Sequence, residues 1–295
     1  IPLIWALYRY NINFQFIMST LSIDFMTGSS VNEKINERLC AASDAVQTES
    51  QRIEDEIEAF ETFETELHQI STSTQEPLQP FNPVEFRTHS SPSMTETLQE
   101  LYHSTVMAVP HYEEDYDESF FENLSAEFGP ELVLLIDKAE CFDRRLKSII
   151  ETHIREAIDE RENLAATLSA EKEAVERITA QLQKVATKID SLQYSEHAPD
   201  DFCSLESHWR QLEILESKCD TLAAERQETI RMLERKAGTQ NHQISLNQYL
   251  YQDLQHEYPV LASIALIGQY KASIQAKVEK QISCVSIRAT KATEH

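Results

Sequence analysis

Apolar residues recur at alternating steps of three and four along three long stretches of this sequence. In the first stretch these positions are Ile35, Leu39, Ala42, Val46, Ile53, Phe60, Phe63, Leu67 and Ile70. Glu49 and Glu56 fill two further positions of the same series. An average spacing of 3.5 residues places such side chains on one face of a helix, as in a coiled coil. We therefore predict one long helix over residues 31–71, and we call its apolar face a seam.

The second and third stretches predict a helical hairpin. The second carries Ile154, Ala157, Leu164, Leu168, Val175, Ile178, Leu182, Val185, Ile189 and Leu192, and the third carries Leu205, Trp209, Leu212, Cys219, Ala223, Ile230 and Leu233. Between them, Pro199 and Asp201 are stop and N-cap signals. Two long helices joined by a short loop fold back on each other. We therefore predict an antiparallel coiled-coil hairpin over residues 144–236, with its turn at 193–201.

The pairing of layers in this hairpin can be written down from the sequence. When Leu192 is set opposite Phe202, the apolar layers align without a slip, and Leu168 lies opposite Arg226. Leu215 and Leu222 widen the apolar face and leave room for a third helix. The helix over 31–71 is the natural candidate to pack along the hairpin, although the sequence does not give its direction.

Charged residues interrupt the second and third seams. They are Arg161, Glu171, Glu216 and Arg226. Two interpretations are open for them. Buried polar residues can fix the register of a coil or pair with a third helix. Alternatively, long charged side chains can lie along an apolar edge with their heads in water.

The segments 93–143 and 243–284 flank the hairpin and are richer in aromatic residues than the seams. Aromatic side chains bury large areas, as a globular core requires. We therefore predict that the two segments meet as one small helical head, which gives an all-α fold. The remaining parts are a poorly ordered or wrongly started N-terminal extension over 1–30, a Pro/Ser/Thr-rich linker over 72–92 and a tail over 285–295.

Charge and cysteine usage narrow the classes of partner. The formal net charge is −24, and binding to nucleic acid needs a basic face that releases counterions. We therefore expect no nucleic acid as a partner. No stretch of about 20 apolar residues predicts a membrane span, so we also expect no membrane association. The five cysteines have no CxxC spacing, which is typical of a reduced, cytoplasmic protein.

The stretch "MAVPHYEEDYDESFFENLSAEFG" is the strongest candidate for chemistry. His111, Glu114, Asp115 and Glu118 share one helix face at i, i+3, i+4 and i+7. Oxygen ligands that converge on one point can bind a hard cation. Asp253 and His256 form a second, smaller group of the same kind.

A structural interpretation competes with this metal site. Pro110 is suited to the first position of a helix, where acidic residues complement the helix dipole. The apolar stripe would then be Tyr112, Tyr116, Phe120 and Leu124, with the acids on the solvent side. We favour this capped helix over the metal site.

Two pairs of motifs resemble a known family. "MAVPHYEEDY" followed by "LSAEFG", and "YLYQDL" followed by "YPVLA", are similar to an uncharacterised domain family of halophilic archaea, over roughly residues 32–283. The resemblance implies no catalytic residues. It also implies a salt-rich archaeal cytoplasm, which matches the acidic composition. We expect structural roles for these residues, with the three tyrosines mostly buried: Pro110, Tyr112, Trp209, Tyr249, Tyr258 and Pro259.

The functional prediction is a non-enzymatic coiled-coil protein that acts in structure or in protein–protein interaction. It needs no cofactor, its partners are proteins, and a homo-oligomer is possible. Phosphate-binding, dinucleotide, nucleophile-elbow and zinc-protease motifs are absent from the sequence. The alternative is a metal-dependent hydrolase or nuclease that uses the acidic and histidine cluster of the head.

Overall fold

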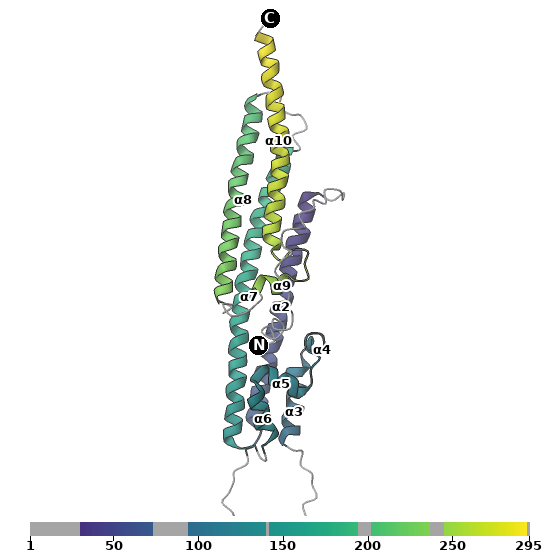
Figure 1. Cartoon of the computed structure of the whole chain (residues 1–295), viewed down its shortest axis with the longest axis vertical. Coiled ribbons are helices and arrows are strands. Elements are labelled where there is room, and N and C mark those ends of the chain that lie inside the picture. Colours follow the sequence, from purple (N-terminus) through teal and green to yellow (C-terminus); the bar gives the residue numbers. More distant parts are fainter. Residues whose placement is uncertain (1–29, 73–93, 140–141, 194–201, 237–244, 294–295) are drawn as a thin grey trace, which may run out of the picture. The chain divides into compact units, whose positions relative to one another are not determined.

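The computed structural model describes residues 30–72, 94–139, 142–193, 202–236 and 245–293, and all regular elements among them are helices (Figure 1). The elements are α2 (Val31–Gln69), α3 (Met94–Ser104), the 3-10 helix η1 (Val106–Ala108), α4 (Tyr112–Asp115), α5 (Phe120–Phe128), α6 (Pro130–Asp137), α7 (Arg144–Gln193), α8 (Phe202–Lys236), α9 (Leu246–Tyr251) and α10 (Pro259–Thr293). The predicted all-α class is confirmed. The predicted N-terminal extension, linker and turn fall almost entirely outside the described residues.

The chain divides into two compact units. Unit 1 contains Ser50–Ala166, and unit 2 contains the described residues of Asn11–Glu49 and Thr167–His295. The long helices α2 and α7 each contribute one part to either unit. None of the described helices is long and apolar enough to cross a membrane.

Helix α2 forms where the seam predicts it. The apolar residues from Ile35 to Leu67 that define the seam are 0–3% exposed. The helix begins after Ser30, which shares a capping box with Glu33: the Ser30 hydroxyl accepts from the Glu33 amide at 3.2 Å, and the Glu33 carboxylate accepts from the Ser30 amide at 2.8 Å. The positions that the sequence predicts to be buried in α2 are therefore the ones that are buried in the structure.

In unit 1, α2 and α7 run antiparallel. Arg161 of α7 binds Glu56 of α2 at 2.7 Å, and Arg155 binds Glu64 at 2.8 Å. The residue number of the partner in α7 therefore falls as the residue number in α2 rises. The direction of the first helix, which the sequence left open, is opposite to that of α7.

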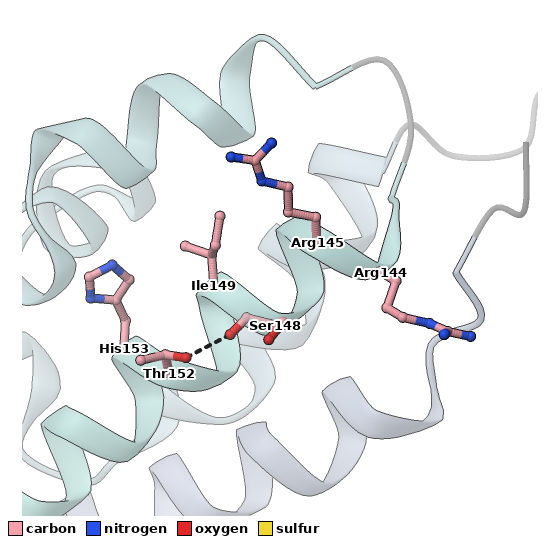
Figure 2. Close-up of a pocket in the computed structure, with 6 residues that line it drawn as sticks. All are labelled: Arg144, Arg145, Ser148, Ile149, Thr152 and His153. Atoms are coloured by element: carbon pink, nitrogen blue, oxygen red, sulfur yellow. Dashed lines mark hydrogen bonds between the residues drawn. The ribbon is translucent and has the colours of Figure 1, made fainter.

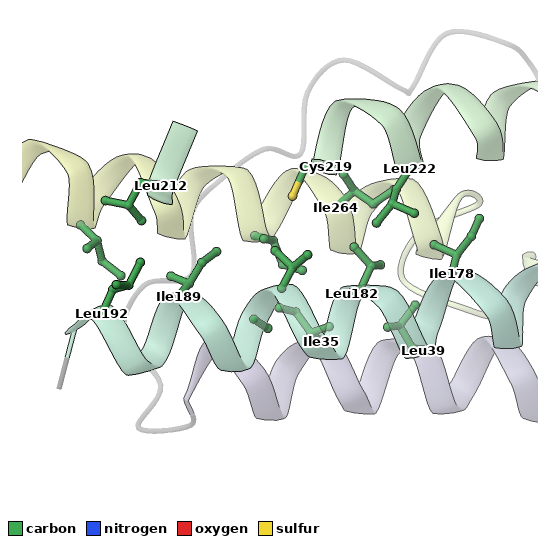
Figure 3. Packing of buried hydrophobic residues seen from close by; sticks show 14 of the residues in the cluster. Ile35, Leu39, Ile178, Leu182, Ile189, Leu192, Leu212, Cys219, Leu222 and Ile264 are labelled. Atoms are coloured by element: carbon green, nitrogen blue, oxygen red, sulfur yellow. The ribbon is translucent and has the colours of Figure 1, made fainter. Parts of the chain in front are cut away.

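The same direction holds in unit 2. Gln183 of α7 donates to Asn36 of α2 at 3.2 Å, and Lys172 donates to Gln47 at 2.5 Å. Figure 3 shows apolar side chains of α2, α7, α8 and α10 pointing into one cluster. Its labelled members are Ile35, Leu39, Ile178, Leu182, Ile189, Leu192, Leu212, Cys219, Leu222 and Ile264.

The prediction of one head built from both flanking segments is wrong. Buried residues of α3, α5 and α6 belong to a cluster with Phe60, Phe63 and Ile154, whereas those of α10 belong to the cluster of Figure 3. Helix α10 runs antiparallel to α8, because Lys271 binds Glu216 at 2.5 Å and Trp209 Nε1 donates to Glu279 at 3.1 Å. It also continues through most of the predicted tail.

One side-chain contact between α7 and α8 reaches across the predicted layers. Arg226 was expected opposite Leu168, but its two terminal nitrogens bind Glu171 at 2.7 and 2.6 Å. The shift is three residues, which is less than one helical turn. A guanidinium on a long stem can reach a carboxylate in the next layer, and a buried charge requires that partner.

The single helix predicted after Pro110 is also wrong. Helix α4 ends at Asp115 and α5 begins at Phe120, with Asp117 between them at a positive φ of 45°. Ser119 caps α5, since its amide and hydroxyl both donate to Glu122 at 3.0 and 2.6 Å. This Ser-x-x-Glu capping box favours a new helix start over continuation of the previous helix.

Candidate functional site

The most heavily charged interior of unit 1 is built around Arg161 of α7. Its Nε donates to Glu56 of α2 at 2.7 Å, and its Nη2 donates to Glu127 of α5 at 3.0 Å. The three side chains are 3%, 8% and 4% exposed. The guanidinium also lies over the ring of Phe60, 4.4 Å from its centroid. We call Glu56, Glu127 and Arg161, with His111 and Tyr116, the Arg161 cluster.

The pKa values of the cluster follow from this pairing. Burial alone raises the pKa of Glu56, but the hydrogen bond with His111, the charge of Arg161 and the hydrogen bond from Tyr116 outweigh it and lower the pKa to about 2. Burial opposes the charge of Arg161 as well, yet Glu127 and Glu56 raise its pKa. Burial and the nearby carboxylates raise the pKa of Tyr116. The pair Glu56–Arg161 is therefore ionised and Tyr116 is a neutral donor.

His111 belongs to this cluster. Its Nε2 lies 3.3 Å from Glu56 Oε1, which also accepts from the Tyr116 hydroxyl at 2.8 Å. The hydrogen bond to Glu56 raises the pKa of His111, although burial opposes the shift. The imidazole therefore stabilises an ionised carboxylate inside the fold.

A small cavity adjoins the cluster. It has a volume of about 10 Å³ and is bordered by Glu56, Phe60, Tyr116, Glu127 and Arg161, among others. This is close to the space that one water molecule occupies. Glu127 Oε2 is buried and has no hydrogen-bond partner among the described residues. A molecule of substrate size does not fit in this space.

The other acidic candidates of this segment point to different partners. Glu114 and Asp115 bind Arg52 of α2 at 3.1 and 3.0 Å. Glu118 accepts from the side chain of Asn123 at 3.2 Å. Because His111 faces Glu56 instead, the four predicted ligands do not converge. Among the described residues, no group of three or more His, Cys, Asp or Glu side chains is arranged to hold a metal ion.

The second predicted pair lies in unit 2. Asp253 is exposed and His256 is half-buried. Burial lowers the pKa of His256, and the positive charge of Arg38 lowers it further. A cation next to this imidazole disfavours a second positive charge, such as a metal ion.

A second buried polar cluster occupies unit 2 and joins three helices. Arg226 of α8 binds Glu171 of α7 through both terminal nitrogens, and one of them also donates to Asn247 of α9 at 2.9 Å. The hydroxyl of Tyr251 of α9 donates to Glu171 at 2.5 Å. All four side chains come from residues no more than 1% exposed. We call this group the Arg226 cluster.

The four charged interruptions of the seams are thus resolved. Arg161 pairs with the first helix, and Glu171 pairs with Arg226 across α7 and α8. Glu216 is 56% exposed and binds Lys271 of α10. Arg161, Glu171 and Arg226 are therefore buried and paired, and they do not lie at a solvated edge.

The residues predicted to be structural have mixed positions. Tyr112 is buried and donates to the Glu118 carbonyl at 3.2 Å, and Pro259 is buried at the first position of α10. Pro110 lies before α4 rather than inside it. Tyr249, which donates to Glu49 at 2.9 Å, and Trp209 are half-buried. Tyr258 is half-buried as well.

The fully buried tyrosines are others, which the sequence did not single out. Tyr102 and Tyr251 are both 0% exposed. The hydroxyl of Tyr102 donates to Asn123 at 2.7 Å, and its ring meets Phe63 edge to face at 5.3 Å between centroids. Both tyrosines lie in helices of 11 residues or fewer, which are too short for periodicity to identify the buried face.

We predict that acid weakens the fold through Glu56. Its pKa is about 2 in the folded protein and 4.5 ordinarily. A lowered pKa contributes stability above pH 4.5 that is lost as the pH falls towards 2, here about 3 kcal/mol. Glu56→Gln should therefore lose much of this acid slope in urea unfolding followed by circular dichroism. Glu58→Gln, at an exposed position, should retain it, and equal slopes in both variants would refute the assignment.

The contribution of His111 to stability depends on pH in the opposite direction to that of Glu56. Its pKa is raised in the folded protein, so its contribution is present below the ordinary pKa near 6.5 and is lost as the pH rises through the raised value. The cluster is therefore most stable in mildly acidic solution.

Comparison with known proteins adds a family but no activity. No curated protein and no solved structure shows significant similarity to this chain. The model of one family, the domain of unknown function DUF7260, matches residues 37–274. This range is most of the 295-residue chain and lies inside the span of the resemblance noted in the sequence. The chain therefore belongs to the family of the domain of unknown function DUF7260.

Proposed function

We propose that this protein is a non-catalytic helical scaffold, of the coiled-coil type, that binds other proteins. The observation that supports this most directly is the use of its buried charges. In both clusters, ionisable side chains from different helices bind one another, and the cavity beside Arg161 has about 10 Å³. Ligand pockets generally enclose roughly 300–1,000 Å³. These groups hold helices together, and the cavity beside Arg161 is too small for a substrate.

Exposed apolar side chains on the helices provide the surface for partners. Leu134 and Leu135 of α6 are 54% and 50% exposed, and Ile214 and Met232 of α8 are 68% and 48% exposed. Apolar groups that lie at the surface contribute to association when a partner removes them from water. Long helices present such groups over an extended surface.

The proposed setting is the salt-rich cytoplasm of a halophilic archaeon. The net charge of −24 supports it, because a high salt concentration screens the repulsion among surface carboxylates. The resemblance of the tyrosine and proline motifs points to the same source.

Affinity purification from the native host, at its own salt concentration, tests the scaffold function. The tagged full-length protein should recover a partner in stoichiometric amount. Leu134→Glu together with Leu135→Glu should reduce that recovery at least tenfold without loss of helix, since both positions are exposed. Gln211→Glu, at a polar and half-exposed position of α8, serves as a control and should change nothing.

One result would contradict the proposed scaffold function. It would be a protein recovered without partners that carries stoichiometric manganese, iron or zinc and hydrolyses a phosphodiester or peptide. Loss of that metal on replacement of His111 and Glu114 together would then identify a hydrolase.

A further inference from the structure

The first turns of α7 line an open hollow in unit 1. Two neighbouring stripes of side chains border it, each with steps of four residues. One stripe is Arg144, Ser148 and Thr152, and the other is Arg145, Ile149 and His153 (Figure 2). The hollow has a volume of about 590 Å³. We call it the α7 groove.

The groove carries positive charge in a strongly acidic protein. Arg144 and Arg145 are exposed, and neither forms an ion pair within the described part of the chain. Carboxylates outnumber cationic side chains by 50 to 26 in the whole sequence, so two adjacent arginines with no carboxylate partner among the described residues are unexpected. The nearest acid in sequence, Asp143, accepts from the Leu146 amide at 2.7 Å and caps the helix.

The dipole of α7 adds to this charge at its N-terminal end. At the far end of the groove, His153 lies 3.2 Å from Glu156, so the positive potential is concentrated over the two arginines. Between the two ends, Ile149 offers an apolar contact, and Ser148 is exposed beside it (Figure 2).

The directions of the arginines select the kind of ligand. Neighbouring residues on a helix point about 100° apart, and Figure 2 shows the two guanidinium groups directed away from each other. One compact anion cannot bind both of them. An extended ligand can reach both when its charges are separated. From Arg144 to His153 the helix rises about 14 Å, which is about four residues of extended peptide.

We propose that the α7 groove binds an acidic peptide segment of a partner protein, with carboxylates on Arg144 and Arg145 and an apolar side chain on Ile149. The proposal rests on the scaffold function above and names the chemistry of one partner. Charge complementarity with the two exposed arginines favours this occupant, because they form a local positive patch on a chain whose net charge is negative.

Fluorescence anisotropy with the full-length protein tests the groove. The probe is a fluorescein-labelled peptide of glutamates with a leucine at every third position. Saturable binding to the wild type should weaken at least tenfold in Arg144→Gln/Arg145→Gln. The matched control is Arg231→Gln/Arg235→Gln, which removes two exposed charges that are already bound to Glu228 and should leave binding unchanged.

Three outcomes would overturn the proposal: no saturable binding, equal weakening in both double variants, or inorganic phosphate competing at the same concentration as the peptide. The last would indicate a site for a compact anion. A failure of the groove is distinguishable from a failure of the scaffold, since partner recovery from the host is measured separately and depends on Leu134 and Leu135.

Discussion

Replacing Arg161 with Met should lower the free energy of unfolding by about 3–5 kcal/mol, the usual loss when one member of a buried ion pair is removed. The size of this loss follows from the side chains that surround Arg161. Glu56 and Glu127 would remain 8% and 4% exposed with no cation between them, and Phe60 would lose the guanidinium on its ring. Urea unfolding followed by circular dichroism at neutral pH measures this loss.

Two variants separate the buried charge from other effects. Arg155→Met removes the partner of Glu64 at a position that is 59% exposed, and it should cost less than about 1 kcal/mol. Arg161→Lys keeps the charge but loses the planar fork that serves two carboxylates at once, so its cost should fall between the two. A loss below 1 kcal/mol for Arg161→Met would show that the cluster is not a buried ion pair in solution.

The parts of the fold that could be predicted are those in which burial follows from local spacing. The seam of α2 recurs every three or four residues over 39 residues, so the buried face is determined by the helix alone. The same holds for α7 and α8. Periodicity states which face is buried but not which helix covers it. For that reason the sequence does not show which core α10 joins, since its apolar residues fit either a head or a bundle.

The buried charges also differ in how far the sequence identifies them, according to the length of the helix that carries them. Arg161, Glu171 and Arg226 are recognisable from the sequence as charges at seam positions, but the sequence does not decide between a buried partner and a solvated edge. Their partners Glu127, Asn247 and Tyr251 lie in helices of 9 and 6 residues, where no repeat indicates the buried face. Two or three turns of helix contain too few apolar positions to define a stripe.

The sequence contains a signal for the break between α4 and α5, but the aromatic stripe favours a continuous helix. The stripe of aromatic residues at steps of four suggested one helix through Tyr116 and Phe120. Ser119 and Glu122 form a capping box that starts a new helix. The capping bonds satisfy amides that a continuous helix would have used, so the local hydrogen bonds prevail over the apolar repeat.

The second large effect is expected at Arg226. Its guanidinium is the only cation of the Arg226 cluster among the described residues, and it binds Glu171 through two nitrogens. Arg226→Met should again cost about 3–5 kcal/mol, because Glu171 is 0% exposed and would be left as a lone charge. The variant should unfold at lower urea with an unchanged dependence on urea concentration if the native fold is retained.

Removing both charges distinguishes pairing from packing. A buried ion pair replaced by apolar side chains of similar volume is often neutral or stabilising, so Arg226→Met/Glu171→Leu should recover most of the loss. One cost remains in that variant, since the Tyr251 hydroxyl loses its acceptor at 2.5 Å, and adding Tyr251→Phe should remove it. Full additivity of the two single substitutions would contradict the pair. A strong positive coupling would instead show that Glu171 and Arg226 act as one unit that joins α7, α8 and α9.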